Sequence, residues 1–111
     1  MNNGAFTPFG ATVLVGTTEV QVSSGARNTG PTAYRVRNLL STPQYFSWAP
    51  AAPLGGAAPS ITVTAPTAGV PSNNTLGLAA FGIEVFGGLP ANAFFKANAA
   101  ACFEITPGEG L

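Results

Sequence analysis

Glycine and proline, which recur along the whole chain, constrain its fold more than any other feature of the sequence. The 111 residues include 14 glycines and 10 prolines. Relative to alanine, glycine disfavours a helix interior by about 1 kcal/mol and proline by about 3 kcal/mol. Between them lie short runs rich in valine, isoleucine, phenylalanine and threonine, which are typical of strands joined by turns. The sequence therefore predicts an all-β fold.

Apolar and polar residues alternate in several of these runs, as in strands with one buried face. In residues 33–40, Tyr34 and Val36 lie on one face and Arg35 and Arg37 on the other. The same pattern predicts strands at 11–15, 18–23, 44–48, 61–64, 94–97 and 101–106, with further extended runs at 76–78 and 81–86, and the last strand is expected to end at Pro107-Gly108. The side chains expected to point inward are Val20, Val22, Tyr34, Val36, Phe46, Trp48, Ile61, Val63, Phe103 and Ile105.

Seven or eight short antiparallel strands, roughly ten residues apart, are the pattern of a β-sandwich or jelly roll. The length suits one domain, 1–111, in which residues 1–10 are expected to form an extended N-terminal arm. Two connections, 49–59 and 65–74, are long and rich in alanine, proline and glycine. Proline-stiffened loops lose less entropy on docking than flexible ones, so we expect at least one of them to contact another protein.

Charged residues are unusually few. Four basic and four acidic residues make 7% of the chain, whereas a typical soluble domain is about a quarter charged. Net charge near zero favours association. The chain is either a weakly charged monomer kept in solution by hydroxyls and amides, or a subunit whose surface is largely covered by other protein. We favour the second interpretation and expect a homo-oligomer.

The sequence lacks the side chains that most catalytic and metal sites need. It contains no histidine and no aspartate, so its serines and Cys102 have no usual general base, and no zinc or iron ligand cluster can be assembled. Cys102 is expected to be a small packed or interface residue. Paired glutamates can hydrolyse glycosidic bonds, but Glu84 and Glu104 belong to a chain too small to favour a sugar-binding cleft. We predict no enzyme activity, no cofactor and no metal.

Nucleic-acid and membrane partners are not expected either. Arg35 and Arg37 lie near several aromatic residues that could stack bases, but four cations offset by four anions make a weak field for phosphates. Gly87-Gly88 is followed by no Lys-Ser/Thr pair and is interpreted as a turn rather than a phosphate loop. No apolar run approaches the ~20 residues of a membrane span, and no signal peptide is recognisable.

Two kinds of residue are candidates for a protein interface: the arginines on the polar face of 33–40 and the apolar positions of the long loops. Arginine holds carboxylates with its planar fork, so Arg35 and Arg37 are expected to meet Glu84, Glu104 or a carboxylate of a partner chain. The candidate interface residues are Arg35, Arg37, Pro53, Leu54, Pro59, Pro66, Val70 and Pro71.

Three parts of the chain resemble small virion proteins of tailed bacteriophages. They are the sequence Tyr-Arg-Val-Arg-Asn at 34–38, the sequence Tyr-Phe-Ser-Trp at 45–48, and the tail, from 82–86 through 89–95 to 103–111. More loosely, the chain is similar to capsid decoration, or cement, proteins with jelly-roll folds. The resemblance carries no catalytic motif.

This resemblance implies a structural role in a virion. The chain is then expected to be made in the host cytoplasm and to bind the lattice of major capsid proteins on the outside of a bacteriophage capsid, where it stabilises the shell. Two alternatives stay open. One is a tail, neck or fibre-associated β-module, and the other is a carbohydrate-binding module on the virion surface that uses Trp48 or a tyrosine as a stacking platform.

Overall fold

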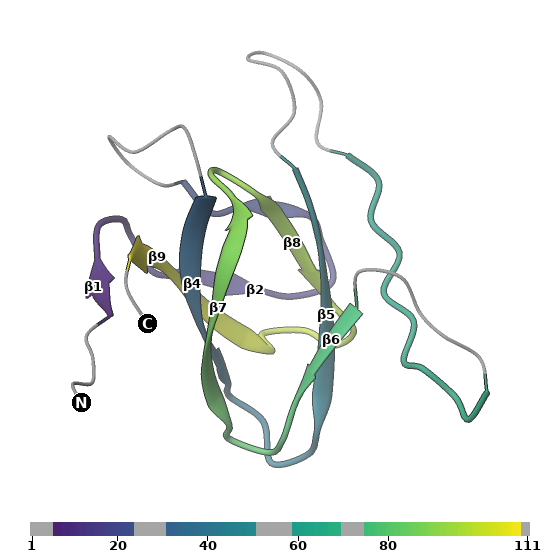
Figure 1. The fold of residues 1–111 in the computed structure, drawn as a ribbon. Coiled ribbons are helices and arrows are strands. Elements are labelled where there is room, and N and C mark those ends of the chain that lie inside the picture. Colours follow the sequence, from purple (N-terminus) through teal and green to yellow (C-terminus); the bar gives the residue numbers. More distant parts are fainter. Residues whose placement is uncertain (1–5, 24–30, 51–58, 70–74, 110–111) are drawn as a thin grey trace.

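The computed structural model describes residues 6–23, 31–50, 59–69 and 75–109. Within these ranges the chain forms nine strands and no helix, which confirms the predicted all-β sandwich (Figure 1). The strands are β1 (Thr7–Pro8), β2 (Val13–Val15), β3 (Val20–Gln21), β4 (Pro31–Asn38), β5 (Gln44–Ala49), β6 (Thr75–Leu78), β7 (Ile83–Pro90), β8 (Phe94–Ala97) and β9 (Phe103–Glu109).

The strands form two antiparallel sheets. Sheet A has the order β1-β9-β4-β7, with β2 paired beside β1 on the same edge of β9. Sheet B has the order β3-β8-β5-β6. Strands β2 to β9 therefore make two sheets of four strands, β2-β9-β4-β7 and β3-β8-β5-β6, which is the strand order of a jelly roll. The short β1 comes from the part of the chain expected to be an N-terminal arm.

Aromatic rings fill the space between the sheets. Phe46 of sheet B packs edge-on against Phe103 and Phe86 of sheet A, with ring centroids 5.2 and 5.5 Å apart. Tyr34 of sheet A meets Phe95 of sheet B at 4.9 Å. Edge-to-face pairs at these distances add about 0.5–1.5 kcal/mol each beyond their burial. One shared aromatic core thus joins the two sheets.

Most side chains expected to point inward are buried, and three are not. Val22, Tyr34, Val36, Phe46, Ile61, Phe103 and Ile105 are buried, whereas Val20, Trp48 and Val63 are half-buried. The core also includes residues outside that prediction, among them Val15, Phe95, Ala97 and Cys102. The alternation of apolar and polar residues does not predict that Phe95 is buried. Phe94 beside it is also apolar, so the pattern does not show which of the two faces the core.

Residues 61–64 are not a strand, contrary to the sequence prediction. Ile61 is buried, but its main chain bonds side chains instead of another strand. The Ile61 amide donates to Glu19 Oε2 over 3.0 Å, and Lys96 Nζ donates to the Ile61 carbonyl over 2.9 Å. Alternation marks an extended chain with one buried face, and here two charged side chains satisfy the backbone groups that a strand ladder would have used.

The last strand does not end at Pro107-Gly108 but continues to Glu109. The Pro107 carbonyl accepts a hydrogen bond from the Phe9 amide over 3.1 Å, so this edge of β9 faces the N-terminal segment. Amide and carbonyl of one strand residue point to the same edge, and the edge at Pro107 lies between the pairings of β2 and β1. Proline is tolerated there because no ladder partner requires its missing N–H.

Gly87-Gly88 is part of β7 rather than a turn. Thr32 pairs with Leu89 and Tyr34 with Phe86, so the two glycines stand opposite the single residue Ala33 as a β-bulge. Gly88 has φ +79°, a conformation that glycine adopts without strain. The bulge keeps β4 and β7 paired on both sides and leaves a stretch of sheet A without side chains.

Candidate functional site: the outer face of sheet A

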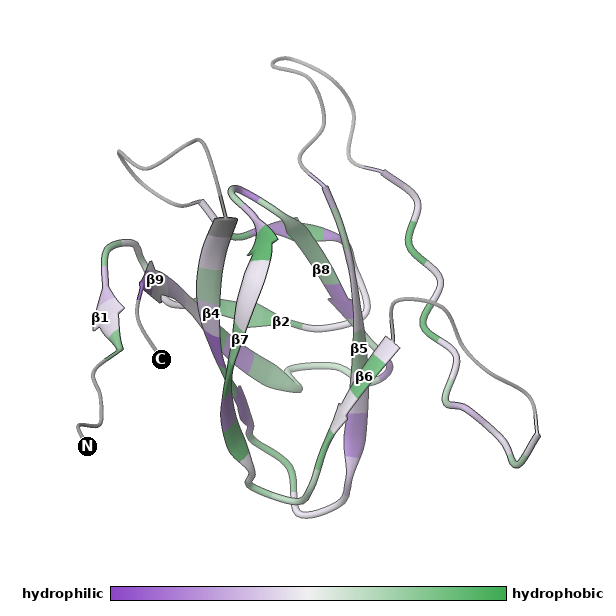
Figure 2. Ribbon diagram, in the orientation of Figure 1, coloured by the Kyte–Doolittle hydropathy of each residue, from purple (hydrophilic) through white to green (hydrophobic). Residues whose placement is uncertain are grey.

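The outer face of sheet A is the side turned away from the core, and β4 defines it. Arg35 and Arg37 are exposed, while Tyr34 and Val36 beside them are fully buried. The arginines therefore stand on the solvent side of a central strand, as the alternation of 33–40 predicts. Figure 2 shows hydrophobic and hydrophilic residues mixed along β4 and β7.

Strand register aligns four residues in a row across this face. Leu14 on β2 is opposite Glu104 on β9, Glu104 is opposite Arg37 on β4, and Arg37 is opposite Ile83 on β7. Directly opposed residues of antiparallel strands point to the same side. Leu14 is 55% exposed and Ile83 is 53% exposed. We call this the Leu14–Ile83 row: an ion pair flanked on both sides by exposed apolar side chains.

The ion pair within the row is open to solvent. Arg37 Nη1 lies 3.5 Å from Glu104 Oε1, and the two side chains are 50% and 41% exposed. Pairs of this kind contribute about 0–1 kcal/mol to folding. The predicted partner Glu104 is thus present, whereas Glu84 is opposite Val36 and lies on the other side of β7 from Arg37. Since the pair adds little to stability, its place between Leu14 and Ile83 suits recognition better.

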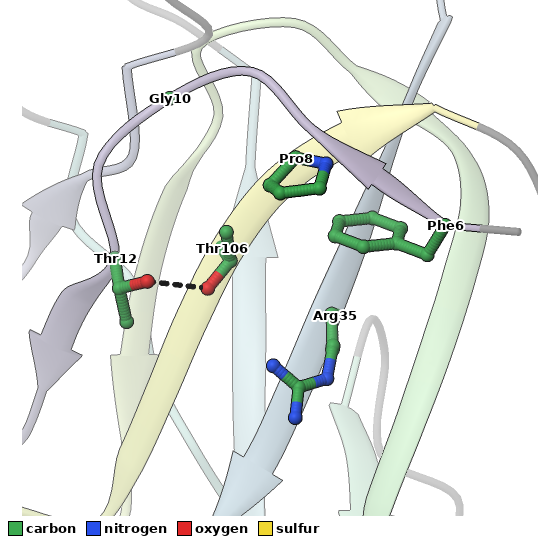
Figure 3. A pocket seen from close by; sticks show the side chains of 6 residues that line it. All are labelled: Phe6, Pro8, Gly10, Thr12, Arg35 and Thr106. Carbon is green, nitrogen blue, oxygen red and sulfur yellow. Dashed lines mark hydrogen bonds between the residues drawn. The ribbon is translucent and has the colours of Figure 1, made fainter.

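A hollow opens beside the row, toward the N-terminal segment. It has a volume of about 500 Å³ and is lined by Phe6, Pro8, Gly10, Thr12, Arg35 and Thr106. Figure 3 shows the ring of Phe6 and Pro8 on one side and the Arg35 side chain on the other. The Thr12 and Thr106 hydroxyls are joined by a 2.7 Å hydrogen bond. Among the described residues, no carboxylate lies within ion-pair distance of Arg35, so its guanidinium is available to a carboxylate of another molecule.

The Phe6 ring can lie over β9 and line this hollow because Gly108 has no side chain there. A methyl group at Gly108 would collide with the Phe6 ring and with the Thr7 carbonyl. Gly108 lies two residues after Thr106 and four after Glu104, so the position points to the outer face. The ring of Phe6 therefore lies on the outer face of sheet A and raises that end of it.

A third exposed apolar side chain, Phe81, lies in the turn between β6 and β7. Phe81 is 60% exposed and has φ 54°, a left-handed conformation that costs a bulky residue about 1–2 kcal/mol. Its amide donates to the Leu40 carbonyl over 3.0 Å. The buried Asn38 side chain braces the same turn by donating to the carbonyls of Ala79 and Thr42, each over 3.0 Å. Strain kept at an exposed aromatic is typical of binding sites.

The predicted interface residues are not gathered in one place. Arg35 and Arg37 lie on sheet A, while Pro59 is half-buried and Pro66 exposed on the segment beyond sheet B (Figure 1). Pro53, Leu54, Val70 and Pro71 lie outside the described residues. The sequence analysis missed Leu14, Ile83 and Phe81, because each is an ordinary strand or turn residue until the register and the backbone angle are known.

The described residues contain little that suggests bond-breaking chemistry. The Cys102 thiol is buried, and burial raises its pKa to about 11, so it is protonated and a poor nucleophile at neutral pH. No cluster of three or more metal-binding side chains occurs within the described ranges. In the same part of the chain, no helix is long and apolar enough to cross a membrane.

Comparison with known proteins found no match for this chain. No family model matches it, and neither a curated protein sequence nor a solved structure is significantly similar to it. The residues exposed on its own surface are therefore the main evidence for its function.

Proposed function

We propose that this chain is a non-enzymatic structural subunit of a larger protein assembly, and that the assembly is a bacteriophage capsid which it decorates and stabilises from the outside. The observation that carries the proposal is the outer face of sheet A. It exposes Leu14 and Ile83 around one ion pair, in a chain with only eight charged residues. The choice of a capsid as the assembly rests on the resemblance of parts of the sequence to small virion proteins of tailed bacteriophages.

The composition of the face supports a protein contact. The centres of protein interfaces are depleted in charged residues overall, whereas arginine and aromatic residues are enriched there relative to the rest of the surface. Here the exposed large hydrophobic residues of the described chain are Leu14 beside Glu104, Ile83 beside Arg37, and Phe81. Weak contacts of this kind become strong when one subunit, or an oligomer, grips several capsid subunits at once.

Stabilisation then follows from mass action. A protein that binds the closed shell but not the ruptured shell shifts the equilibrium toward the closed one. Such a subunit would span junctions between capsid proteins and oppose the pressure of packaged DNA. Catalysis has no part in this role.

The first alternative, a tail, neck or fibre-associated module, uses the same surface and differs in copy number. Hundreds of copies per particle favour decoration, and about a dozen favour a neck or tail position. The second alternative, glycan binding, fits the geometry less well. Tyr34 is fully buried, Trp48 is half-buried and packs against the core, and Tyr45 is half-buried, so none of the three is a freely exposed platform.

The decisive experiment compares purified particles with and without this chain, heated in the presence of a DNA-binding dye. Particles that lack the chain should release DNA at a lower temperature, and adding the pure protein back should restore resistance. Stoichiometry relative to the major capsid protein separates the head from the tail. Equal release from both preparations would remove the capsid role.

A pair of variants locates the contact. Ile83→Lys places a charge in the Leu14–Ile83 row, and it should reduce binding to particles. Thr64→Lys adds the same charge at an exposed position beyond sheet B, and it should bind like the wild type. Equal binding of the two variants would show that sheet A does not face a protein in the particle.

A further inference from the structure

We infer that the partner of the outer face of sheet A is a second copy of this chain, related by a twofold axis that runs parallel to the strands, midway between β9 and β4. The inference rests on the proposal that this face is a protein contact, and it names the occupant. It leaves the Phe81 turn and the long loops for contacts with other proteins.

The Leu14–Ile83 row has the pattern that self-pairing requires. Across β2, β9, β4 and β7 it reads apolar, negative, positive, apolar. A twofold axis along the strands reverses this order in the facing copy. Arg37 then meets the partner copy's carboxylate at position 104, and Leu14 meets its isoleucine at position 83. Four charges form a neutral square, with an apolar contact on either side.

The neighbouring rows fit the same axis. The next row along the strands contains Thr106 on β9, Arg35 on β4 and Val85 on β7. Thr106 is only 8% exposed, and its hydroxyl bonds that of Thr12 inside the hollow. Reversal therefore places the guanidinium of Arg35, which has no carboxylate partner among the described residues, over the hollow of the partner copy, where hydroxyl oxygens can still accept a hydrogen bond.

The end of the face that the Phe6 ring raises also has a matching surface on the second copy. The Phe6 ring covers Gly108, which pairs with Ala33, and Ala33 stands opposite the bulge of Gly87 and Gly88. Reversal places the raised Phe6 end of one copy over the glycines of the other, where there are no side chains. Nothing lies within 4 Å of the place where a Gly88 side chain would be. A projection on one half of the face thus meets a flat area on the other.

The alternative twofold axis, across the strands, is disfavoured by charge. Any such axis stacks β4 on the β4 of the partner, and β4 presents the two arginines. Like charges opposed across an interface cost several kcal/mol. The arrangement of acid on β9 and base on β4 therefore selects the axis along the strands.

The size of the face sets the strength to be expected. Strands β4, β7 and β9 have seven or eight residues each and β2 has three, so at ~4.8 Å between strands the face covers roughly 400 Å². A standard stable interface takes about 800 Å² from each partner. The dimer should therefore form at high protein concentration, or when copies are held close together in an assembly, and not at trace concentration.

The test uses the full chain and charge reversal in sedimentation equilibrium over a wide concentration range. Wild-type protein should show a concentration-dependent dimer. Arg37→Glu makes the centre of each face wholly negative and Glu104→Arg makes it wholly positive. Either variant alone should dimerise on the order of 100-fold more weakly, because like charges then oppose each other. An equimolar mixture of the two should regain dimerisation, as a heterodimer.

The matched control is Glu84→Arg, which changes charge by the same amount on the same sheet but on the other side of β7 from Arg37. It should dimerise like the wild type. The inference is overturned by a wild-type chain that stays monomeric at the highest concentration, by reversal variants that associate unchanged, or by a mixture that stays monomeric. A monomer that still protects particles would overturn the dimer alone, and a dimer that leaves particles unprotected would overturn the capsid role alone.

Discussion

The two outer faces of this sandwich are built from similar strands but differ in how far their outward side chains are exposed to solvent. On sheet B, Ser47 points away from the core between Phe46 and Trp48, yet it is only 2% exposed. Ile61 is buried, and its main chain is held by Glu19 and by Lys96, which is opposite Ser47 in the register of β5 and β8. On sheet A, residues at the corresponding outward positions, Leu14 and Ile83, are more than half exposed.

The two faces differ in whether the chain's own residues cover them. On sheet B, Ile61 from the described part of the connection between β5 and β6 is held by Glu19 and Lys96, which themselves form an ion pair with 3.4 Å between Nζ and Oε2. On sheet A, Leu14 and Ile83 stay more than half exposed, and none of the residues that the structure describes covers the Leu14–Ile83 row in this way. The exposed Leu14 and Ile83 are the reason that we propose this face as the interaction site.

The largest effect is expected in the core that both faces share. Phe103→Ala should lower the free energy of unfolding by about 3–5 kcal/mol, because it removes a buried ring that packs on Phe46. Chemical denaturation measures the loss. Phe81→Ala is the matched control, since it deletes an exposed ring and should change stability by less than about 1 kcal/mol. Equal losses would mean that the two rings are not buried and exposed as described.

The next effect tests the covered face. Ile61→Ala should cost about 2 kcal/mol, at the low end for a buried isoleucine, because the segment can detach instead of leaving a cavity. Val63→Ala, on the same segment but half-buried, should cost less. Proteolysis should then cleave within 59–69 before the rest of the described chain in the Ile61 variant. Cleavage elsewhere first would show that Ile61 does not secure this segment.

The ion pair on the covered face predicts a dependence on pH. Hydrogen bonds from the Ile61 amide, and from Lys96, hold the pKa of the Glu19 carboxyl below its ordinary value of 4.5. A lowered folded-state pKa means that the pairing is complete at neutral pH and is lost as the pH falls through that lower value. The NMR signal of the Ile61 amide should follow this titration. In Glu19→Gln the titration should be absent, and a midpoint above 4.5 would contradict the pairing.

The smallest effect on stability is expected on the bare face. Leu14→Thr with Ile83→Thr keeps residues that suit strands and removes only exposed apolar surface. Unfolding free energy should stay within about 0.5 kcal/mol per substitution, while self-association and particle binding should fall. Denaturation and sedimentation on the same samples check both. Lost stability with unchanged association would reverse the proposed roles of the two faces.

Local pattern was enough to predict the fold class and part of the core. The alternation of Tyr34, Arg35, Val36 and Arg37 predicts both the strand and the outward direction of the arginines, because side chains of a strand alternate with period two. The same rule failed at 61–64, where alternation is present but the hydrogen-bond partners are the side chains of Glu19 and Lys96. It also failed at Pro107, which lies inside β9 because the neighbouring edge requires no donor there.

Composition and alternation are enough to predict an all-β sandwich with few charges and a core of alternating apolar residues. Which residues share a surface follows from the tertiary structure alone. Leu14, Glu104, Arg37 and Ile83 come from four strands that are distant in the sequence, and the registers of β2, β9, β4 and β7 place them in one row. Period-two alternation assigns a residue to a face, but its neighbours across the sheet follow from strand order and register, which long-range packing sets.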